Sequence, residues 1–152
     1  MFCIVRLLSI LFVSIAMSTN SYAATQRETK CFEYKYKNIY TGYSTYERVV
    51  KNLGSPLRKE RRAGAVNYHF KKVIINFTGQ ENAKVNTIQI INDHAFKSPD
   101  GIRLNDDVHS TAERLEVRYN HPTLFSKETG INYWHDGEKI IKIVLPHCVY
   151  ID

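Results

Sequence analysis

The sequence predicts an α+β fold in which two helix-plus-antiparallel-sheet repeats occur in tandem, with the helices on one face of the sheet. Residues 44–56 and 110–122 are identical at five of thirteen positions, and both carry the signals of a short helix. Segments with alternating or continuous apolar residues, typical of strands, follow both helices in the same order. The chain has 152 residues, a length that allows one compact domain or two very small ones.

The first 23 residues differ from the rest and predict a signal peptide. A start with one positive charge, Arg6, precedes an apolar run of eleven residues, and a polar stretch then ends in small residues. We expect cleavage after Ala23, because Ser21 and Ala23 occupy the two positions that signal peptidase recognises. A membrane-spanning helix needs about 20 apolar residues. The sequence therefore predicts a periplasmic or secreted protein that has no membrane span after cleavage.

The mature chain, residues 24–152, is predicted to be a single secreted domain made of the two repeats, about 31–92 and 101–148. Its two cysteines, Cys31 and Cys148, lie near the two ends. In an oxidising compartment we predict that they form a disulfide. A metal site is the alternative, but no second Cys lies close in sequence to either cysteine. Only His147 adjoins Cys148, and one His with one Cys does not make a metal site. We predict no metal site and no cofactor.

Each predicted helix has its own start and stop signals. Ser44 with Glu47, and Ser110 with Glu113, fit capping boxes, in which the hydroxyl and the carboxylate satisfy free amides of the first turn. A Gly or an Asn two residues before a proline ends each helix, because these residues tolerate the left-handed cap and proline blocks continuation.

Strands are predicted before and after the helices. An alternating strand, Cys31–Lys37, precedes the first helix. The remaining strands are expected at 65–68, 72–77 and 84–90 in the first repeat, and at 130–133 and 139–145 in the second, where 135–138 forms a hairpin turn. The charged run Arg58–Arg62 is predicted to lie in a loop, and residues 93–100 are predicted to link the repeats.

Alternation along these strands divides their side chains between a core side and an open face. On the core side we place Val66, Tyr68, Phe70, Ile88, Ile90, Ile131, Tyr133, Ile143 and Leu145. On the open face we place Asn67, His69, Ile74, Thr87, Gln89, Asn132, Trp134, Lys142 and Val144. Trp134 is the main candidate for partner binding, because Trp is enriched among the residues that dominate protein interfaces. The alternative for Trp134 is a partly buried surface aromatic, and for His69 a surface histidine with satisfied hydrogen bonds.

The charge of the mature chain completes the candidate site. Without Arg6, 20 Lys and Arg face 15 Asp and Glu, a formal charge of +5. Arg61 and Arg62 belong to the densest charged run, which either pairs with an acidic partner surface or forms a solvated loop. Nucleic acid is discounted as a partner, because a secreted protein rarely meets it. The predicted partner-binding residues are Trp134, His69, Asn132, Asn67, Lys142, Arg61 and Arg62.

Residue patterns typical of an active site are missing from the sequence. The six histidines show no metalloprotease spacing, and no Gly-x-Ser-x-Gly motif occurs. Capping of the second helix explains the carboxylate pair Asp106 and Asp107. We therefore predict no catalytic residues and no enzyme activity. A buried cluster of two or more histidines with a carboxylate would reopen the question.

The two capped helices, each followed by antiparallel strands, resemble one superfamily. It contains the beta-lactamase inhibitor protein and the SmpA/OmlA-type outer-membrane assembly lipoprotein domain. The stretch Gly101–Asp107 is similar to the lead-in found there, and the resemblance covers residues from about 38 to 146. It implies a non-enzymatic protein whose open sheet face binds a partner.

Together these observations predict a secreted periplasmic binding protein that inhibits or neutralises a partner by steric occlusion. The partner is expected to be a secreted hydrolase or a toxin, and in the second case the chain is an immunity protein. The alternative is a soluble, non-enzymatic factor of cell-envelope assembly or maintenance, which binds its partner without inhibiting it.

Overall fold

The computed structural model describes residues 28–62, 64–79, 83–119 and 122–151. The predicted signal peptide, residues 1–23, lies outside the described residues. Strands hold 42% of the described part of the chain and helices 13%. The protein is therefore mostly β, and the prediction of an α+β fold made of two helix-plus-sheet repeats is wrong.

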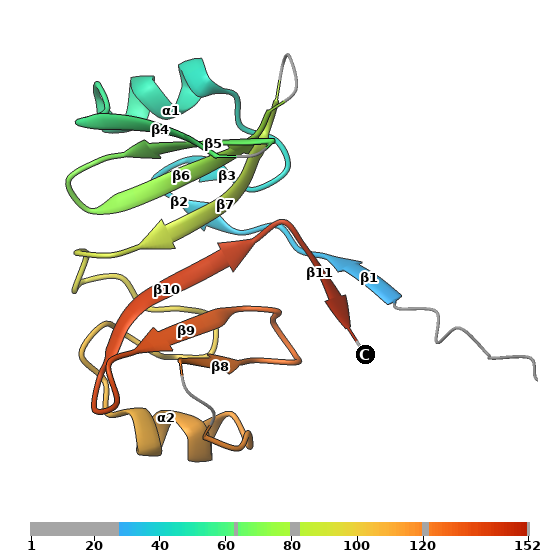
Figure 1. The fold of residues 1–152 in the computed structure, drawn as a ribbon, viewed down its shortest axis with the longest axis vertical. Coiled ribbons are helices and arrows are strands. Elements are labelled where there is room, and N and C mark those ends of the chain that lie inside the picture. Colours follow the sequence, from blue (N-terminus) through green and yellow to red (C-terminus); the bar gives the residue numbers. More distant parts are fainter. Residues whose placement is uncertain (1–27, 63, 80–82, 120–121, 152) are drawn as a thin grey trace, which may run out of the picture.

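Seven strands form one continuous antiparallel sheet in the order β4-β5-β6-β7-β10-β9-β8 (Figure 1). They are β4 (Arg58–Arg62), β5 (Ala65–His69), β6 (Val73–Thr78), β7 (Val85–Ile90), β8 (Thr123–Phe125), β9 (Asn132–His135) and β10 (Ile140–Pro146). β7 pairs with β10, so that Ile90 lies opposite Ile143 and Ile88 opposite Leu145. This pairing joins the two halves of the chain into a single sheet.

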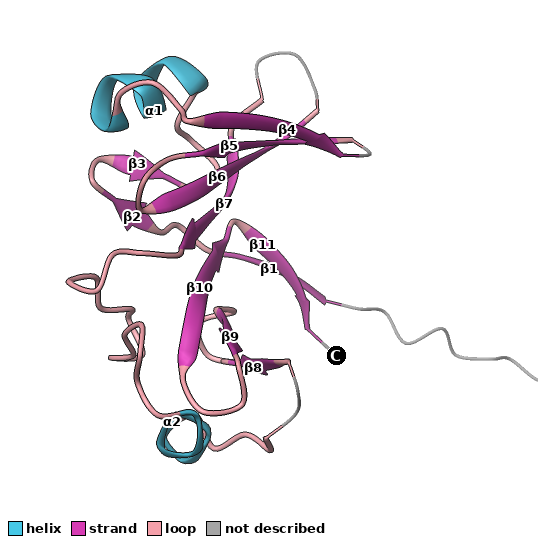
Figure 2. Ribbon diagram, turned by 60° about the vertical axis from the view of Figure 1, so that its left-hand side comes forward, coloured by secondary structure: helices cyan, strands magenta, loops and turns pink. Residues whose placement is uncertain are grey.

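Two short strand pairs lie outside this sheet (Figure 2). They are β2 (Lys35–Tyr36) with β3 (Ile39–Tyr40), and β1 (Glu28–Cys31) with β11 (Cys148–Ile151). The charged run predicted as a loop is β4, an edge strand of the large sheet.

The two helices lie at opposite ends of the sheet rather than together on one of its faces (Figure 1). α1 (Tyr46–Leu53) lies at the β4 end. α2 (Val108–Arg114) lies next to the turn between β9 and β10, where the Val108 amide donates a hydrogen bond to the Glu138 carbonyl. The helices bury only Val49, Val108, Thr111 and Ala112. The hydrophobic core is thus built mainly by the sheet. The helices contribute fewer buried side chains to it than the predicted helix-plus-sheet repeats imply.

The helices begin at other residues than the predicted capping boxes. Thr45, and not Ser44, is the N-cap of α1. Asp107 caps α2, because its carboxylate accepts a hydrogen bond of 2.8 Å from the Ser110 amide. The capping role expected for Asp107 is therefore confirmed, while Ser110 acts as donor to it.

Burial confirms most of the predicted core side. Tyr133, Ile143 and Leu145 are almost completely buried, and Val66 and Tyr68 are half-buried. The other predicted core residues, Phe70, Ile88, Ile90 and Ile131, are all buried.

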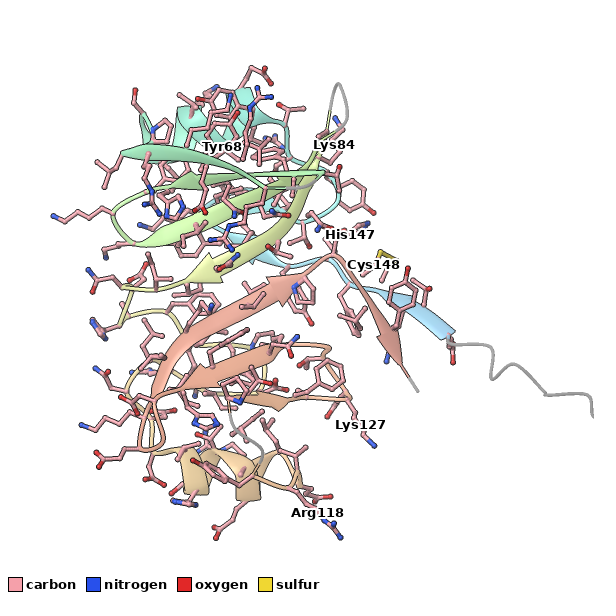
Figure 3. The ribbon with its side chains drawn as sticks, viewed as in Figure 1. Tyr68, Lys84, Arg118, Lys127, His147 and Cys148 are labelled. Atoms are coloured by element: carbon pink, nitrogen blue, oxygen red, sulfur yellow. A yellow bond between two sulfur atoms is a disulfide. The ribbon has the colours of Figure 1, made fainter. Side chains whose placement is uncertain are left out.

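The disulfide predicted from the sequence is present in the structure. Cys31 and Cys148 lie opposite each other in the β1–β11 pair, with their sulfur atoms 2.10 Å apart (Figure 3). The bond joins residues separated by 117 positions. It therefore ties the beginning of the described chain to its end.

The side chain of Asp93 connects three segments of the chain, those that contain Tyr36, Lys72 and Asp93 itself. Its carboxylate is buried and accepts hydrogen bonds from the Tyr36 hydroxyl at 2.7 Å and from the Lys72 ammonium at 3.1 Å. Burial by itself raises the pKa of Asp93, but these two hydrogen bonds and the charges of Lys72 and Lys37 together hold the pKa below its ordinary value. The ionised form is thus the one that stabilises the fold.

Asp93→Asn is expected to lower the free energy of unfolding at pH 7 by about 1.5–3 kcal/mol, the usual worth of hydrogen bonds to a charged group. A lowered folded-state pKa adds stability above the unfolded-state pKa of about 3.9, and that stability is lost as the pH falls through the folded-state value. The gap between wild type and variant should therefore shrink on acidification. Urea unfolding at pH 7 and pH 3 measures it, and an unchanged gap contradicts the prediction.

Candidate protein-binding face

One row of side chains crosses the large sheet from edge to edge on the side away from the core. Residues directly opposite each other in paired strands share a face of the sheet. The row consists of Arg58, His69, Ile74, Gln89, Val144, Asn132 and Phe125, one from each strand. All of these residues retain exposure to solvent. We call this side of the sheet the open face.

Trp134 on β9 is an exposed aromatic residue on the open face. It lies opposite Thr123 on β8 and Lys142 on β10, and its side chain is 36% exposed. The Lys142 ammonium lies 4.0 Å from the centre of the indole, a cation–π contact. Partial burial lowers the pKa of Lys142. Lys142 thus holds one side of the indole, and the exposed remainder is free to meet a partner.

A shallow hollow surrounds Trp134. Its volume is about 490 Å³. It is lined by Thr87, Gln89, Pro122, Thr123, Asn132, Trp134, Lys142 and Val144. Four strands and the segment that precedes β8 contribute to it, so this hollow exists only because β7 and β10 pair.

Polar side chains at the other end of the open face bind one another. The side-chain amide of Asn76 donates a hydrogen bond of 2.7 Å to the side-chain oxygen of Asn67. The side-chain amide of Asn86 donates one of 3.2 Å to the side-chain oxygen of Asn76. His69 Nε2 lies 3.2 Å from the Glu60 carboxylate. Asn67 and His69 therefore have partners within the protein, as the alternative for His69 expects.

The two arginines proposed for partner binding lie on different faces. Glu60 is the acceptor of a 2.6 Å ion pair with Arg62, and the hydrogen bond from Arg62 is the main cause that lowers the pKa of Glu60. Arg62 and Glu60 point to the open face with Asn67, the residue opposite Glu60. Arg61 lies opposite Val66 and points to the core side. Because the run Arg58–Arg62 forms a strand, its side chains point alternately to the two faces of the sheet. The prediction of a loop for this run therefore did not separate Arg61 from Arg62.

The structure brings together six of the seven predicted site residues on one face, but not at one point. Four strand spacings separate His69 on β5 from Trp134 on β9, which corresponds to about 19 Å. A small molecule does not span that distance, whereas a protein surface does. Arg58, Glu60 and Phe125 also lie on this face but could not be placed there from the sequence, because β4 and β8 lack the apolar alternation that marks a strand.

One group of possible metal ligands gathers within the described residues. Atoms of Cys31, His147 and Cys148 lie within 4.8 Å of one another. The two sulfur atoms form the disulfide, so neither is a thiolate that can bind a metal ion.

In the ranges that the structure describes, neither helix is long or apolar enough to span a membrane. Comparisons of the chain with protein-family models, curated proteins and solved structures found no match. The resemblance to the superfamily of the beta-lactamase inhibitor protein therefore stays a prediction.

Proposed function

We propose that this chain is a periplasmic or secreted protein that binds another exported protein through the open face and inhibits or neutralises it by steric occlusion. The observation that carries the proposal is the exposed indole of Trp134, seated beside Lys142 in a hollow of the open face. Trp residues in such settings dominate protein interfaces. The disulfide and the predicted signal peptide support an oxidising compartment.

The size of the open face favours a protein partner over a small ligand. Six strand spacings separate Arg58 from Phe125, so the row is about 29 Å long. A standard interface takes about 800 Å² from each partner, a patch of similar width. The hollow at Trp134 is open and shallow, and it suits a side chain or a loop that projects from the partner.

The charge of the chain indicates an acidic partner. The mature chain has a formal charge of +5, and Arg58 and Arg62 outnumber Glu60 at the β4 edge of the open face. Such an excess accelerates association with an acidic surface and weakens with added salt. Fast association is useful to an inhibitor, because the inhibitor must bind its target before the target acts.

Trp134→Ala is expected to weaken partner binding by about 30-fold or more, the effect of removing a dominant interface residue. Tyr150→Ala is the matched control, because Tyr150 is 72% exposed but lies on β11, outside the large sheet. Oxidised wild-type protein and both variants would be immobilised and exposed to periplasmic extract and to secretions of neighbouring bacteria. A protein retained by wild type and Tyr150→Ala, but lost with Trp134→Ala, is the partner.

The activity of that partner then separates the two candidate functions. Stoichiometric loss of its hydrolytic or toxic activity supports the inhibitor. Binding without loss of activity, especially of an envelope protein, supports an assembly or maintenance factor. Equal retention by all three proteins, with equal melting temperatures, removes Trp134 from the interface.

A further inference from the structure

The charged run of β4 is divided between two environments. On the open face, Arg58 and Arg62 both pair with Glu60. Lys59 and Arg61 project to the opposite face, next to Tyr68 and Val66. Among the described residues, no carboxylate lies within ion-pair distance of Lys59 or Arg61. Within the described residues, these two cations therefore share one small area that has no carboxylate at ion-pair distance.

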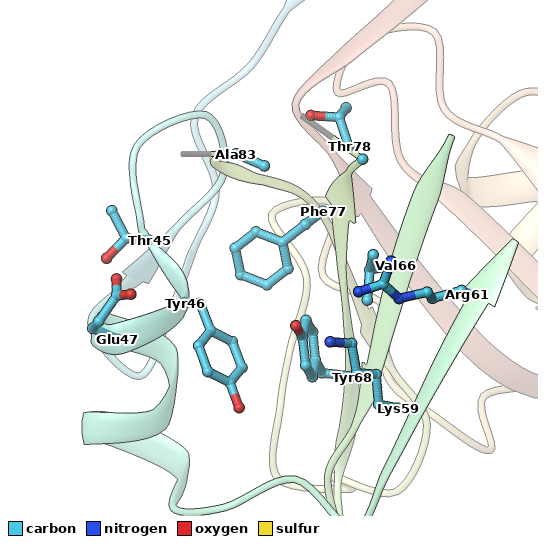
Figure 4. A pocket seen from close by; sticks show the side chains of 11 residues that line it. Thr45, Tyr46, Glu47, Lys59, Arg61, Val66, Tyr68, Phe77, Thr78 and Ala83 are labelled. Atoms are coloured by element: carbon cyan, nitrogen blue, oxygen red, sulfur yellow. The ribbon is translucent and has the colours of Figure 1, made fainter. Parts of the chain in front are cut away.

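These two cations line a cavity of about 350 Å³ between α1 and the strands β4 to β6 (Figure 4). Its floor is aromatic, with the Tyr46 and Tyr68 rings 4.5 Å apart and the Phe77 ring 5.7 Å from that of Tyr68. The Lys59 ammonium lies 5.4 Å from the centre of the Tyr68 ring. The first turn of α1 forms one side of the cavity, and β4, β5 and β6 form the other.

The far wall of the cavity has the opposite polarity. Glu47, in the first turn of α1, lies across the aromatic floor from Arg61 (Figure 4). The hydrogen bond with Thr45 is the main cause that lowers the pKa of Glu47, so its carboxylate is charged at neutral pH. A molecule in this cavity therefore meets cations at one end, flat rings in the middle and a hydrogen-bond acceptor at the other end.

We propose that this cavity is a binding site for a small planar organic acid. The acid group lies against Lys59 and Arg61, the planar body packs on Tyr68 and Phe77, and a hydroxyl or amino donor at the far end faces Glu47. Guanidinium groups bind carboxylates well, and a cavity of this size with a few polar groups is typical of small-ligand sites. The site is separate from the open face, so it goes beyond the proposed function and does not depend on it.

The test uses 4-hydroxybenzoate as the probe and the mature, oxidised protein. Titration is followed by amide chemical shifts in two-dimensional NMR. We expect saturable shifts at Tyr46, Tyr68 and Phe77, and none at Trp134 on the opposite face. The neutral analogue 4-hydroxybenzamide has the same shape without the charge and should bind at least about tenfold more weakly.

Two neighbouring arginines provide a matched pair of variants. Arg61→Gln should weaken binding of 4-hydroxybenzoate about tenfold or more, and Arg62→Gln, on the open face, should leave it within about twofold. Both side chains are exposed, so both variants should keep the melting temperature of wild type. Equal effects of the two substitutions, equal affinity for the benzamide, or no saturable shifts would each overturn the proposal.

Discussion

Cys31→Ser/Cys148→Ser is expected to lower the free energy of unfolding by about 4–5 kcal/mol, the largest effect of any change considered for this protein. The disulfide closes a loop between residues 117 positions apart, and such a bond removes much of the conformational freedom of the unfolded chain. The melting temperature should fall by roughly 15 °C. Urea and thermal unfolding of the oxidised mature protein and of the double variant measure both quantities.

Reduction of the wild-type protein is the control for this prediction. Its disulfide is the only one possible in the mature chain, because the third cysteine, Cys3, belongs to the predicted signal peptide. Reduced wild type and the double variant should therefore unfold at the same urea concentration. A double variant as stable as the oxidised protein would show that the ends of the chain are held by other contacts.

Ile143→Ala is expected to cost about 3–4 kcal/mol, within the range for a large aliphatic side chain removed from a core. Ile143 is fully buried in β10, opposite Ile90 on one side and Tyr133 on the other. The cavity would therefore open where the two halves of the sheet meet. Urea unfolding measures the loss.

Val144→Ala is the matched control for Ile143→Ala. Val144 is the next residue on the same strand, but it points to the open face and retains exposure to solvent. Its truncation should cost less than about 1 kcal/mol. Equal losses for the two variants would contradict the division of β10 into a core side and an open face.

Part of the fold could be predicted, because short apolar patterns in the sequence indicate individual strands. Residues 85–90 and 140–146 alternate or run apolar, and both form strands whose inward side chains are buried. The pairing of these two strands could not be predicted, because no local pattern says which strand lies next to which. Because β7 and β10 pair, the chain forms one continuous sheet in place of the two expected repeats.

The candidate site was predictable to a similar degree. Alternation placed Trp134 and Lys142 on one face, and the structure has them in contact. The same rule failed at Arg61 and Arg62, because five charged residues in succession carry no apolar alternation and hide a strand. The cavity beside Arg61 depends on how the first turn of α1 lies relative to β4, β5 and β6, which is a property of tertiary packing.

The two edge strands of the sheet also bear on how the protein behaves at high concentration. An exposed edge strand offers free backbone groups to any other chain, and flat, apolar edges lead to aggregation. Here β4 carries four cations among its five residues, and β8 is only three residues long. Two copies meeting at β4 would place arginine and lysine against arginine and lysine. The sheet is therefore protected against growing into a fibre, and the protein can present a wide, exposed face while remaining dispersed.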